Sequence, residues 1–149
     1  MFNLDAIMTT DLISISPSDT LAKARTLLHE NGIHHLPVVE NDRHLVGLLT
    51  QTDVQAASDS ILRDDDSRIP AADVRVRDVM VTDIATVDEH ATLRQAALFL
   101  EKHRIGCLPV MSDGTLKGII TDTDFVAVAI KLLEQIEETE FDDDLNEAI

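Results

Sequence analysis

The feature that most constrains the fold is that the chain contains one unit twice. A shift of 72 residues superimposes identical residues throughout the unit, including Met8 on Met80, Ala24 on Ala96, and Leu36-Pro37-Val38 on Leu108-Pro109-Val110. From Gly47 onward the shift becomes 71, because the first copy has one extra residue in its turn Glu40–His44. Ordered identity at a fixed period is the signature of a repeat architecture. The fold must therefore accommodate two similar units, over about Ile7–Ala57 and Val79–Val128.

The first half of each unit predicts a strand followed by a helix. Leu12–Ser16 alternates apolar and polar side chains, which is typical of a short strand. After a turn with N-cap residues, apolar residues recur at helical spacing: Leu21, Ala24 and Leu28. Gly32 is a natural stop for this helix. The second copy has Arg104 at the equivalent position, so we expect a less secure stop there.

The second half of each unit predicts two buried strands and a closing helix. Pro37–Val39 and Leu45–Leu49 are apolar runs joined by a polar turn. The equivalent turn of the second copy, Ser112–Thr115, contains Asp-Gly, which is a strong hairpin signal. The last helix starts near Thr50 in one copy and near Thr121 in the other. Each unit thus predicts strand, helix, strand, strand, helix, and the chain as a whole a mixed α/β (α+β) fold.

These boundaries divide the chain into four parts. We expect a first repeat over residues 1–57, a linker over 58–77, a second repeat over 78–133 and an acidic tail over 134–149. The linker is polar and contains Asp64–Asp66 and Pro70. Leu132, Leu133 and Ile136 extend a helical stripe beyond the second repeat, whereas Phe141–Asp144 is expected to fray. The acidic tail is interpreted as a solvated charged face, with a docking element as the alternative.

Charge and composition exclude several classes of function. The net charge of −16 repels phosphate backbones, and the chain has no Trp or Tyr and only four Phe on which bases could stack, so we expect no nucleic-acid binding. The longest apolar runs, such as Phe125–Ile130, are far too short to span a bilayer, and no basic-then-apolar leader opens the chain. A single cysteine cannot form an internal disulfide. We therefore expect a soluble, cytoplasmic protein with no membrane partner.

The segment with the clearest chemical potential is Gly47–Asp53, which is repeated as Gly118–Asp124. Each is a strand that ends in two threonines and an aspartate at the start of a helix. Threonine hydroxyls and free N–H groups at a helix N-terminus suit a phosphate, and a carboxylate can accept hydrogen bonds from two ribose hydroxyls. The alternative is a capping box, in which Thr50 caps the helix and Asp53 bonds back. The duplication does not decide between them, because both helices need caps.

In these residues the sequence resembles the CBS domain, the regulatory repeat of the cystathionine β-synthase type. The resemblance covers both copies and rests on the strands Ile33–Val39 and Ile105–Val110, each followed by the Gly…Thr-x-Thr-Asp segment. The length, the short linker and the Cys-Leu-Pro-Val strand are most similar to bacterial stand-alone CBS pairs of the acetoin-utilisation type. The resemblance implies two repeats packed about a pseudo-twofold axis, a so-called Bateman module.

The family also implies two clefts for adenosine derivatives such as AMP, ADP, ATP or S-adenosylmethionine. One cleft would use Thr50, Thr52 and Asp53 for ribose and phosphate, with adenine against Ala85, Ile105 and Gly106. The other would use Thr121, Thr123 and Asp124, with adenine against Ile13, Ile33 and His34.

The phosphate side departs from the family's pattern. Some nucleotide-binding members carry basic residues immediately before Leu-Pro. The first copy offers His34 and His35, which are only partly charged at neutral pH, and the second offers the uncharged Gly106 and Cys107. This disfavours a bare triphosphate at the Asp124 site, unless Mg²⁺ is bound or the ligand carries little charge.

The remaining reactive side chains predict no chemistry of their own. His34 and His35 are neighbours on a strand and point to opposite faces, so they cannot chelate one ion. Cys107 lies in an apolar strand, where a free cysteine is usually buried and inert. Met8 and Met80 are expected to pack rather than react. We therefore expect no catalytic residue, no metal site and no resident cofactor.

Three classes of function follow from these observations. The leading hypothesis is a non-catalytic sensor that binds an adenosine derivative and then alters an unknown protein target in trans or its own assembly. The second is a structural module with degenerate clefts that works by dimerising, and the third is a small enzyme, which no triad, metal set or glycine-rich loop supports. We expect a homodimer, because Phe125–Ile130 is apolar all round and a second copy would cover it. Alternatively, the extension through Leu133 and Ile136 folds back onto it.

Overall fold

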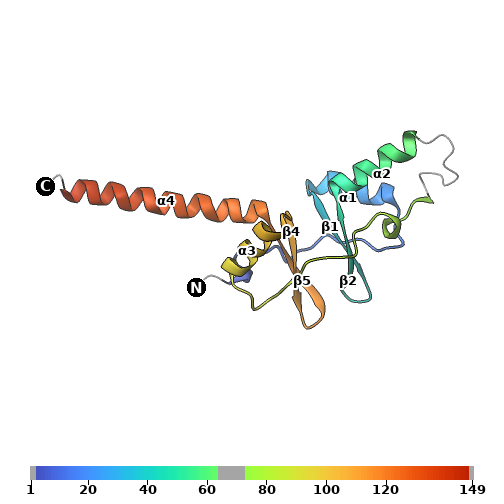
Figure 1. Ribbon diagram of the computed structural model, residues 1–149, viewed down its shortest axis with the longest axis horizontal. Helices are drawn as coiled ribbons and strands as arrows, with labels where there is room; N and C mark the ends of the chain where they lie inside the picture. Colours follow the sequence, from blue (N-terminus) through green and yellow to red (C-terminus); the bar gives the residue numbers. More distant parts are fainter. Residues whose placement is uncertain (1–2, 64–72, 148–149) are drawn as a thin grey trace.

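The computed structural model describes residues 3–63 and 73–147, and it contains two small sheets that carry separate helices (Figure 1). The first sheet is an antiparallel hairpin of β1 (His35–Glu40) and β2 (His44–Thr50). The helices α1 (Leu21–Asn31) and α2 (Gln51–Arg63) pack against this hairpin. The predicted strand–strand–helix order of the first repeat is therefore confirmed.

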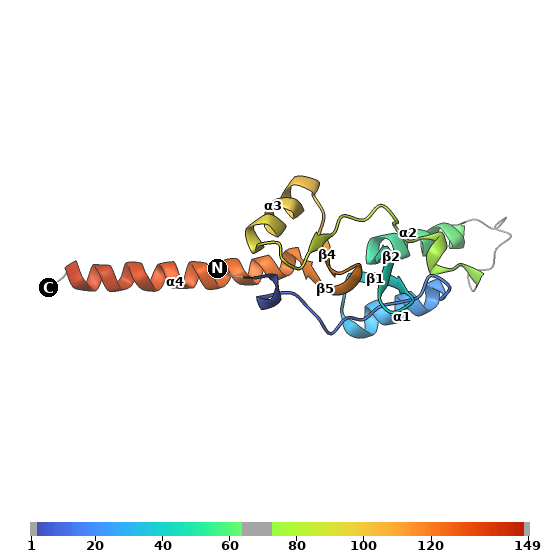
Figure 2. The same cartoon turned by 90° about the horizontal axis from the view of Figure 1, so that it is seen from below.

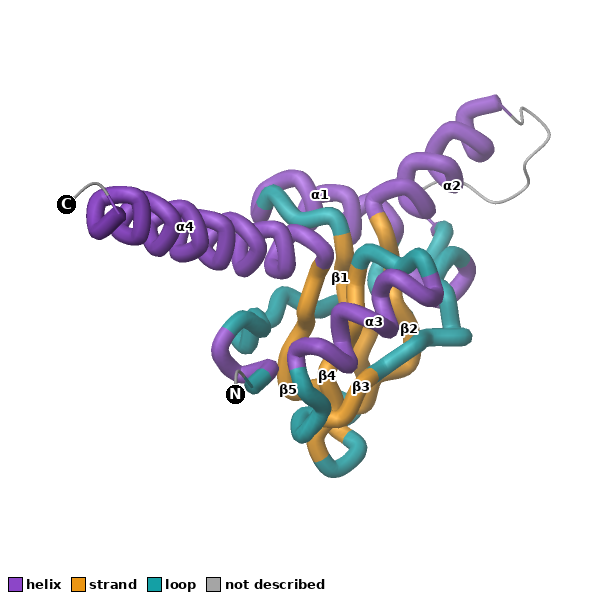
Figure 3. Tube along the Cα trace, turned by 60° about the vertical axis from the view of Figure 1, so that its left-hand side comes forward, coloured by secondary structure: helices purple, strands orange, loops and turns teal. Residues whose placement is uncertain are grey.

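The second sheet repeats this plan with one added short strand. It orders β3 (Val87–Asp88), β4 (Cys107–Ser112) and β5 (Thr115–Thr121), with β3 parallel and β5 antiparallel to β4. α3 (Leu93–His103) covers β4, and α4 (Asp122–Glu147) leaves the end of β5 (Figure 3). The two sheets meet where β2 lies against β5. The mixed α/β fold of two repeats is thus confirmed.

The opening strand of each repeat is shorter than predicted. Of the expected strand Leu12–Ser16, only Ile15 pairs, in a parallel bridge with Val38, and in the second copy β3 has two residues. Ile15 donates its N–H to the Pro37 carbonyl, and Val39 donates back to Ile15. The next bond of this parallel ladder, toward Ile13, would need an N–H from Pro37, which proline lacks. The proline of the Leu-Pro motif therefore ends the pairing.

Both helix stops use the same backbone conformation, although their residues differ. Gly32 follows α1 with φ 59°, and Arg104 follows α3 with φ 52°, so both lie in the left-handed region. Each donates its N–H back to carbonyls of the last helical turn. The expectation of a less secure stop at Arg104 is therefore wrong, because the repeat imposes the left-handed geometry even without glycine.

The segment that precedes each repeat packs on the other repeat. Leu4, in the short 3-10 helix η1 (Leu4–Ala6), is fully buried in the core of the second repeat. Val76, in the equivalent helix η3 (Val76–Asp78), is fully buried in the core of the first. Thr9 and Ile119 exchange backbone hydrogen bonds, as do Leu48 and Val81. Each hydrophobic core is therefore built from both halves of the chain.

This exchange places Met8 and Met80 over glycines of the opposite repeat. A Cβ built on Gly47 would lie 2.5 Å from Met80 Sδ, and one on Gly118 would lie 2.8 Å from Met8 Sδ. Gly47 pairs with Val38 and Gly118 with Val110, where each hairpin ladder has its irregularity. The interpretation of both methionines as packing residues is confirmed, and the glycines provide the space.

The expected linker over 58–77 differs from the structure at both ends. α2 continues through Arg63, so the stretch from Ser58 belongs to a helix. At the other end, η3 is part of the first core. Asp64–Asp66 and Pro70 lie outside the described residues.

α4 is longer than predicted and projects away from the two sheets (Figures 1 and 2). The expected fraying of Phe141–Asp144 is wrong, because the helix runs to Glu147. No Gly or Pro occurs within Asp122–Glu147, and Glu, Gln and Leu favour helix. The fold-back of the extension is not seen, and four apolar side chains of α4 are exposed in the single chain: Val126, Ile130, Leu133 and Ile136. Over the described ranges, no helix combines the length and apolar character that crossing a membrane requires.

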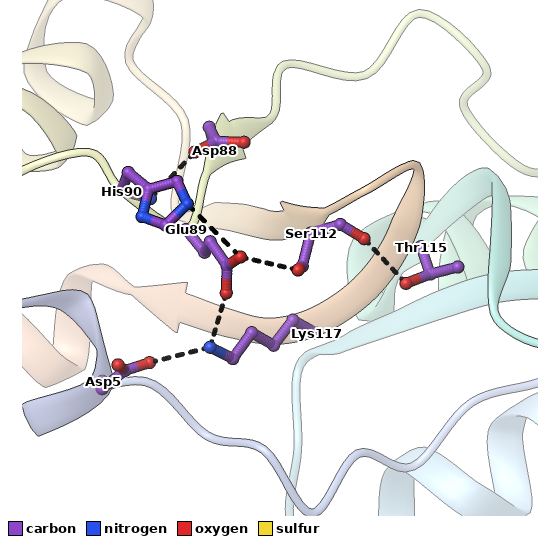
Figure 4. Close-up of polar contacts among 7 residues, drawn as sticks. All are labelled: Asp5, Asp88, Glu89, His90, Ser112, Thr115 and Lys117. Atoms are coloured by element: carbon purple, nitrogen blue, oxygen red, sulfur yellow. Dashed lines mark hydrogen bonds and ion pairs between the residues drawn. The ribbon is translucent and has the colours of Figure 1, made fainter.

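A charged cluster ties η1 to the second sheet (Figure 4). Lys117 Nζ donates to Glu89 Oε2 at 2.6 Å and lies 3.3 Å from Asp5 Oδ1. Ser112 Oγ donates to Glu89 Oε1 at 2.7 Å. Hydrogen bonds from Lys117 and Ser112 lower the pKa of Glu89. The hydrogen bond between Lys117 and Glu89 in turn raises the pKa of Lys117. The cluster is specific to the second repeat, because the first has Val46 in place of Lys117.

Candidate functional site

A cavity of about 370 Å³ lies between the two repeats, within the size range of small-molecule sites. The first repeat contributes the segment before Ile15 and the junction between α1 and β1. The second contributes the end of β5 and the first turn of α4. Its lining residues are Thr9, Asp11, Leu12, Ile13, Gly32, Ile33, His34, His35, Pro37, Ile119, Thr121, Asp122, Thr123 and Asp124.

The left-handed turn at Gly32 positions the first repeat's side of the cavity. Gly32 ends α1, and Ile33 then donates its N–H to the Leu28 carbonyl, which reverses the chain toward β1. Ile33 and His34 follow this turn directly and line the cavity. His34 Nδ1 lies 2.5 Å from Gln51 Oε1, and because a carbonyl oxygen only accepts, Nδ1 is the donor.

The start of α4 forms the opposite wall and shows the capping box. The Thr121 N–H donates to Asp124 Oδ2 at 2.8 Å, and the Asp124 N–H donates to Thr121 Oγ1 at 3.4 Å. Thr121 Oγ1 also donates to Asp124 Oδ2 at 3.2 Å. Within the described residues, Asp124 Oδ1 accepts no hydrogen bond. The carboxylate therefore caps its helix with one oxygen and keeps the other for a further donor.

The equivalent cap of the first repeat is only half formed. Asp53 donates its N–H to Thr50 Oγ1 at 3.1 Å. Its carboxylate makes no hydrogen bond in the part of the chain that the structure describes. The two candidate aspartates therefore differ, since Asp124 is held by its own helix and Asp53 is not.

The structure brings together one of the two sets of residues expected from the sequence. The set that shares the cavity comprises Ile13, Ile33, His34, Thr121, Thr123 and Asp124, and His35 joins it. The other set does not line this cavity. Thr50 ends β2, and Thr52 and Asp53 lie in the first turn of α2. Ala85, Ile105 and Gly106 belong to the second repeat. Ala85 and Ile105 pack against the second core, and the Gly106 carbonyl accepts the Asp122 N–H.

Two carboxylates of the cavity were missed by the sequence analysis. Asp11 precedes the opening strand and Asp122 occupies the variable position of Thr-x-Thr-Asp. Asp11 could have been found from the duplication, because the shift of 72 residues aligns it with an identical residue, Asp83. Asp122 could have been found because it carries a charge where its counterpart in the first repeat, Gln51, is neutral.

Burial sets the protonation of two groups at the starts of β1 and β4. Desolvation lowers the pKa of His35, although the Asp122 carboxylate partly opposes this, so the imidazole is mainly neutral at neutral pH. Burial, with Asp122 and Asp124 nearby, raises the pKa of Cys107 to about 12. Cys107 is therefore a buried thiol, and a thiol is a poor nucleophile.

Two homologous halves with a cavity at their interface define a tandem-repeat module. Comparison with known proteins gives its family. The model of the CBS domain matches residues 4–60 and again 76–131, so the chain belongs to the CBS domain family.

Relatives of similar length share the whole module. A CBS domain-containing protein of Dictyostelium discoideum is 31% identical over 87% of this chain and 92% of its own. A Vibrio cholerae structure described as an acetoin utilization protein (AcuB) is 37% identical, with a TM-score of 0.78 over 93% of this chain and 97% of its own. This confirms the resemblance to pairs of the acetoin-utilisation type.

Two further similarities bear on ligands and on enzymes. The structure of CBSX2 in complex with AMP is 28% identical, with a TM-score of 0.76 over 89% of this chain and 98% of its own. An inosine-5'-monophosphate dehydrogenase of Korarchaeum cryptofilum is 34% identical over 80% of this chain, but the match spans only 23% of the enzyme.

Proposed function

We propose that the protein is a non-catalytic sensor that binds an adenosine derivative in the cavity between its repeats. One observation carries the proposal: seven expected ligand residues, from segments far apart in the sequence, converge on one cavity of suitable size. The AMP complex of the similar CBSX2 supports the ligand class. A cytoplasmic location belongs to the same proposal, because such adenosine derivatives are intracellular metabolites.

Each group in the cavity has a role in the proposed complex. Ile13 and Ile33 offer apolar surface to adenine, and Thr121 and Thr123 offer hydroxyls to the sugar and its 5′ substituent. Asp124 Oδ1 accepts from the ribose hydroxyls while Oδ2 keeps its capping bonds. Because Thr123 and Asp124 form the first turn of α4, the ligand would contact the helix that carries the exposed apolar residues. Binding would then alter a protein target in trans or self-assembly.

A second site at the other end of the pseudo-symmetric pair is part of the proposal. It would use Thr50, Thr52 and Asp53, with Ala85, Ile105 and Gly106 against adenine. The carboxylate of Asp53, which has no hydrogen bond within the described residues, supports this assignment. His35, half-buried near Gly106, would lie between the two sites. Mg²⁺ would accompany a triphosphate, and no resident cofactor is proposed.

Calorimetric titration of the full chain with adenosine, AMP, ADP, ATP and S-adenosylmethionine tests the function. Asp124→Ala should weaken binding roughly ten- to a hundredfold, the cost of a hydrogen bond to a charged group. Asp124→Asn retains a side-chain oxygen for the cap, so it separates ligand binding from helix capping. Asp53→Ala reports on the second site in the same way. Unchanged binding in the Asp53→Ala/Asp124→Ala double variant would make both residues simple caps.

The exposed face of α4 favours a second candidate, a homodimerisation module with degenerate clefts. Val126, Ile130 and Ile136 are all more than half exposed in the single chain, and apolar side chains so placed favour a partner surface. Light scattering at micromolar concentration would give twice 16.4 kDa for a dimer. Ile130→Glu should yield a folded monomer, whereas the matched control Leu98→Glu, equally exposed on α3, should stay dimeric. A wild-type mass near 16.4 kDa would refute the dimer.

A further inference from the structure

The charges that line the cavity are almost all of one sign. Three carboxylates contribute to it, from the opening segment (Asp11) and from the first turn of α4 (Asp122 and Asp124). Neither Lys nor Arg occurs among its described lining residues. The only groups there that could become cationic are the imidazoles of His34 and His35.

Of the two imidazoles, the buried one does not neutralise these carboxylates at neutral pH. His35 loses positive charge through burial. The Nδ1 atom of His34 is committed to Gln51 Oε1, so this nitrogen is not free to face an anion. Among the described residues, Asp122 Oδ1 accepts a hydrogen bond only from the N–H of the adjacent Thr123, at 2.9 Å, and no cation pairs with it.

Asp122 is an exposed residue of the cavity wall, and it lies beside Gly106 and His35. A Cβ built on Gly106 would lie 3.4 Å from Asp122 Oδ2 and 3.6 Å from His35 Nε2. Asp122 and Asp124 also act on the buried Cys107, where they oppose a thiolate. The carboxylates therefore act on the protein interior behind the cleft as well as on the cleft that they line.

We propose that this cleft selects adenosine derivatives whose 5′ substituent is neutral or cationic, and that it rejects 5′-phosphates, with Asp122 as the specificity-determining residue. The inference rests on the proposed function, because it assumes that the nucleoside binds here. A phosphate carries about −1.5 to −2 charges at neutral pH, and a carboxylate within a few ångströms repels it by several kT. A sulfonium or thioether at the same position meets attraction or no penalty. In the first repeat, Gln51 replaces Asp122, so the other proposed site lacks this filter.

The test is a titration of the full chain in EDTA, so that no divalent cation masks the phosphate. Four probes share the nucleoside and differ in charge: adenosine, 5′-methylthioadenosine, S-adenosylmethionine and AMP. An Asp53→Ala background removes the other proposed site. We expect AMP to bind at least tenfold more weakly than adenosine, and its affinity to rise with salt because screening weakens repulsion.

Two charge-removing variants locate the effect. Asp122→Asn keeps the acceptor for Thr123 and should strengthen AMP binding about tenfold, while adenosine changes less than twofold and S-adenosylmethionine weakens. Asp11→Asn, in a different segment, should shift the same ligands in the same direction. Glu101→Gln on the exposed surface of α3 removes the same charge far from the cleft and should change nothing.

The outcomes separate this inference from the function on which it rests. If adenosine binds and AMP binds as tightly in both wild type and Asp122→Asn, the selectivity is wrong and the sensor function stands. If none of the four probes binds, both the selectivity and the binding of an adenosine derivative at this cleft are wrong. Weak AMP binding relieved by Asp122→Asn supports both.

Discussion

At the scale of single residues, the two repeats are joined by close contacts at glycine. Gly47 admits the Met80 side chain, and Gly118 admits the Met8 side chain together with the Thr9 backbone. Since these partners come from the segment that leads into the other repeat, each glycine is a contact between halves. The sequence alignment marked both glycines as part of a ligand motif, but the structure gives each of them a packing role as well.

Alanine substitution at these glycines should therefore be destabilising, and more so at Gly118. Its Cβ would lie 3.0 Å from the Thr9 carbonyl oxygen, which cannot move away, whereas the Met80 side chain beside Gly47 is flexible. Overpacking of this kind costs about 1–3 kcal/mol. Urea denaturation of both variants should show a loss of unfolding free energy for Gly118→Ala at the upper end of this range. A smaller effect for Gly118→Ala than for Gly47→Ala would contradict this assignment.

The charged cluster of Glu89 predicts a pH dependence of stability. Because Lys117 and Ser112 lower the pKa of Glu89 in the folded state, its contribution is fully present above the ordinary glutamate pKa of about 4.3. That contribution disappears as the pH falls through the lower folded value. Denaturation curves should therefore show Glu89→Gln to be less stable than wild type at pH 7, with the difference vanishing in acid. Glu101→Gln is the control and should show no such pattern.

At the scale of elements, the sequence predicts correctly those turns and helix ends that depend only on neighbouring residues. The hairpin turn at Asp113-Gly114 has both residues at positive φ, as Asp-Gly predicts, and the helix caps at Thr20 and Thr92 form. The predicted length of the opening strands was wrong, because the alternation of apolar and polar residues in Leu12–Ser16 carries no information about the partner strand. There, the missing N–H of Pro37 limits the pairing to Ile15.

The residues that end α1 and α3, Gly32 and Arg104, test how much free energy the left-handed backbone conformation costs. Arg104 adopts φ 52°, which glycine adopts freely and other residues adopt at a cost of about 1 kcal/mol. Arg104→Gly should accordingly raise the free energy of unfolding by up to about 1 kcal/mol. Gly32→Ala should lower it by a similar amount, although nothing lies within 4 Å of a Cβ there. Chemical denaturation checks both, and a neutral Gly32→Ala would contradict the backbone argument.

At the scale of the whole molecule, the repeats are not independent units. The sequence boundary between residues 57 and 78 follows the duplication, but the cores do not. Leu4 belongs with Leu108 and Ile120, and Val76 belongs with Leu36 and Leu49. No local pattern could reveal this exchange, because a buried residue in a short leading segment does not specify which core it enters. The same limit applies to the candidate site, where residue types predicted the Asp124 set but only the fold placed Asp11 and Asp122 beside it.

Exchange of the leading segments predicts a single cooperative unfolding transition. Leu4→Ala removes a fully buried side chain and should cost about 2–5 kcal/mol. Although Leu4 leads into the first repeated unit, which begins at about Ile7, the loss should destabilise the second repeat directly, and with it the whole chain. Hydrogen exchange should show amides of β4 and β5 exposed along with those of β1 and β2. Loss of protection confined to β1 and β2 would contradict the placement of Leu4 in the core of the second repeat.

α4 is attached to the rest of the molecule at one end only. Its first turn carries Asp122, Thr123 and Asp124, and its last described residue is Glu147. A helix of 26 residues measures about 39 Å at 1.5 Å per residue, so a tilt of about 10° at the cleft displaces its far end by about 7 Å. The helix is in this sense a lever arm with its fulcrum at the proposed ligand cleft. A rearrangement there too small to disturb either core would be magnified at the acidic tip into a movement that another protein could detect.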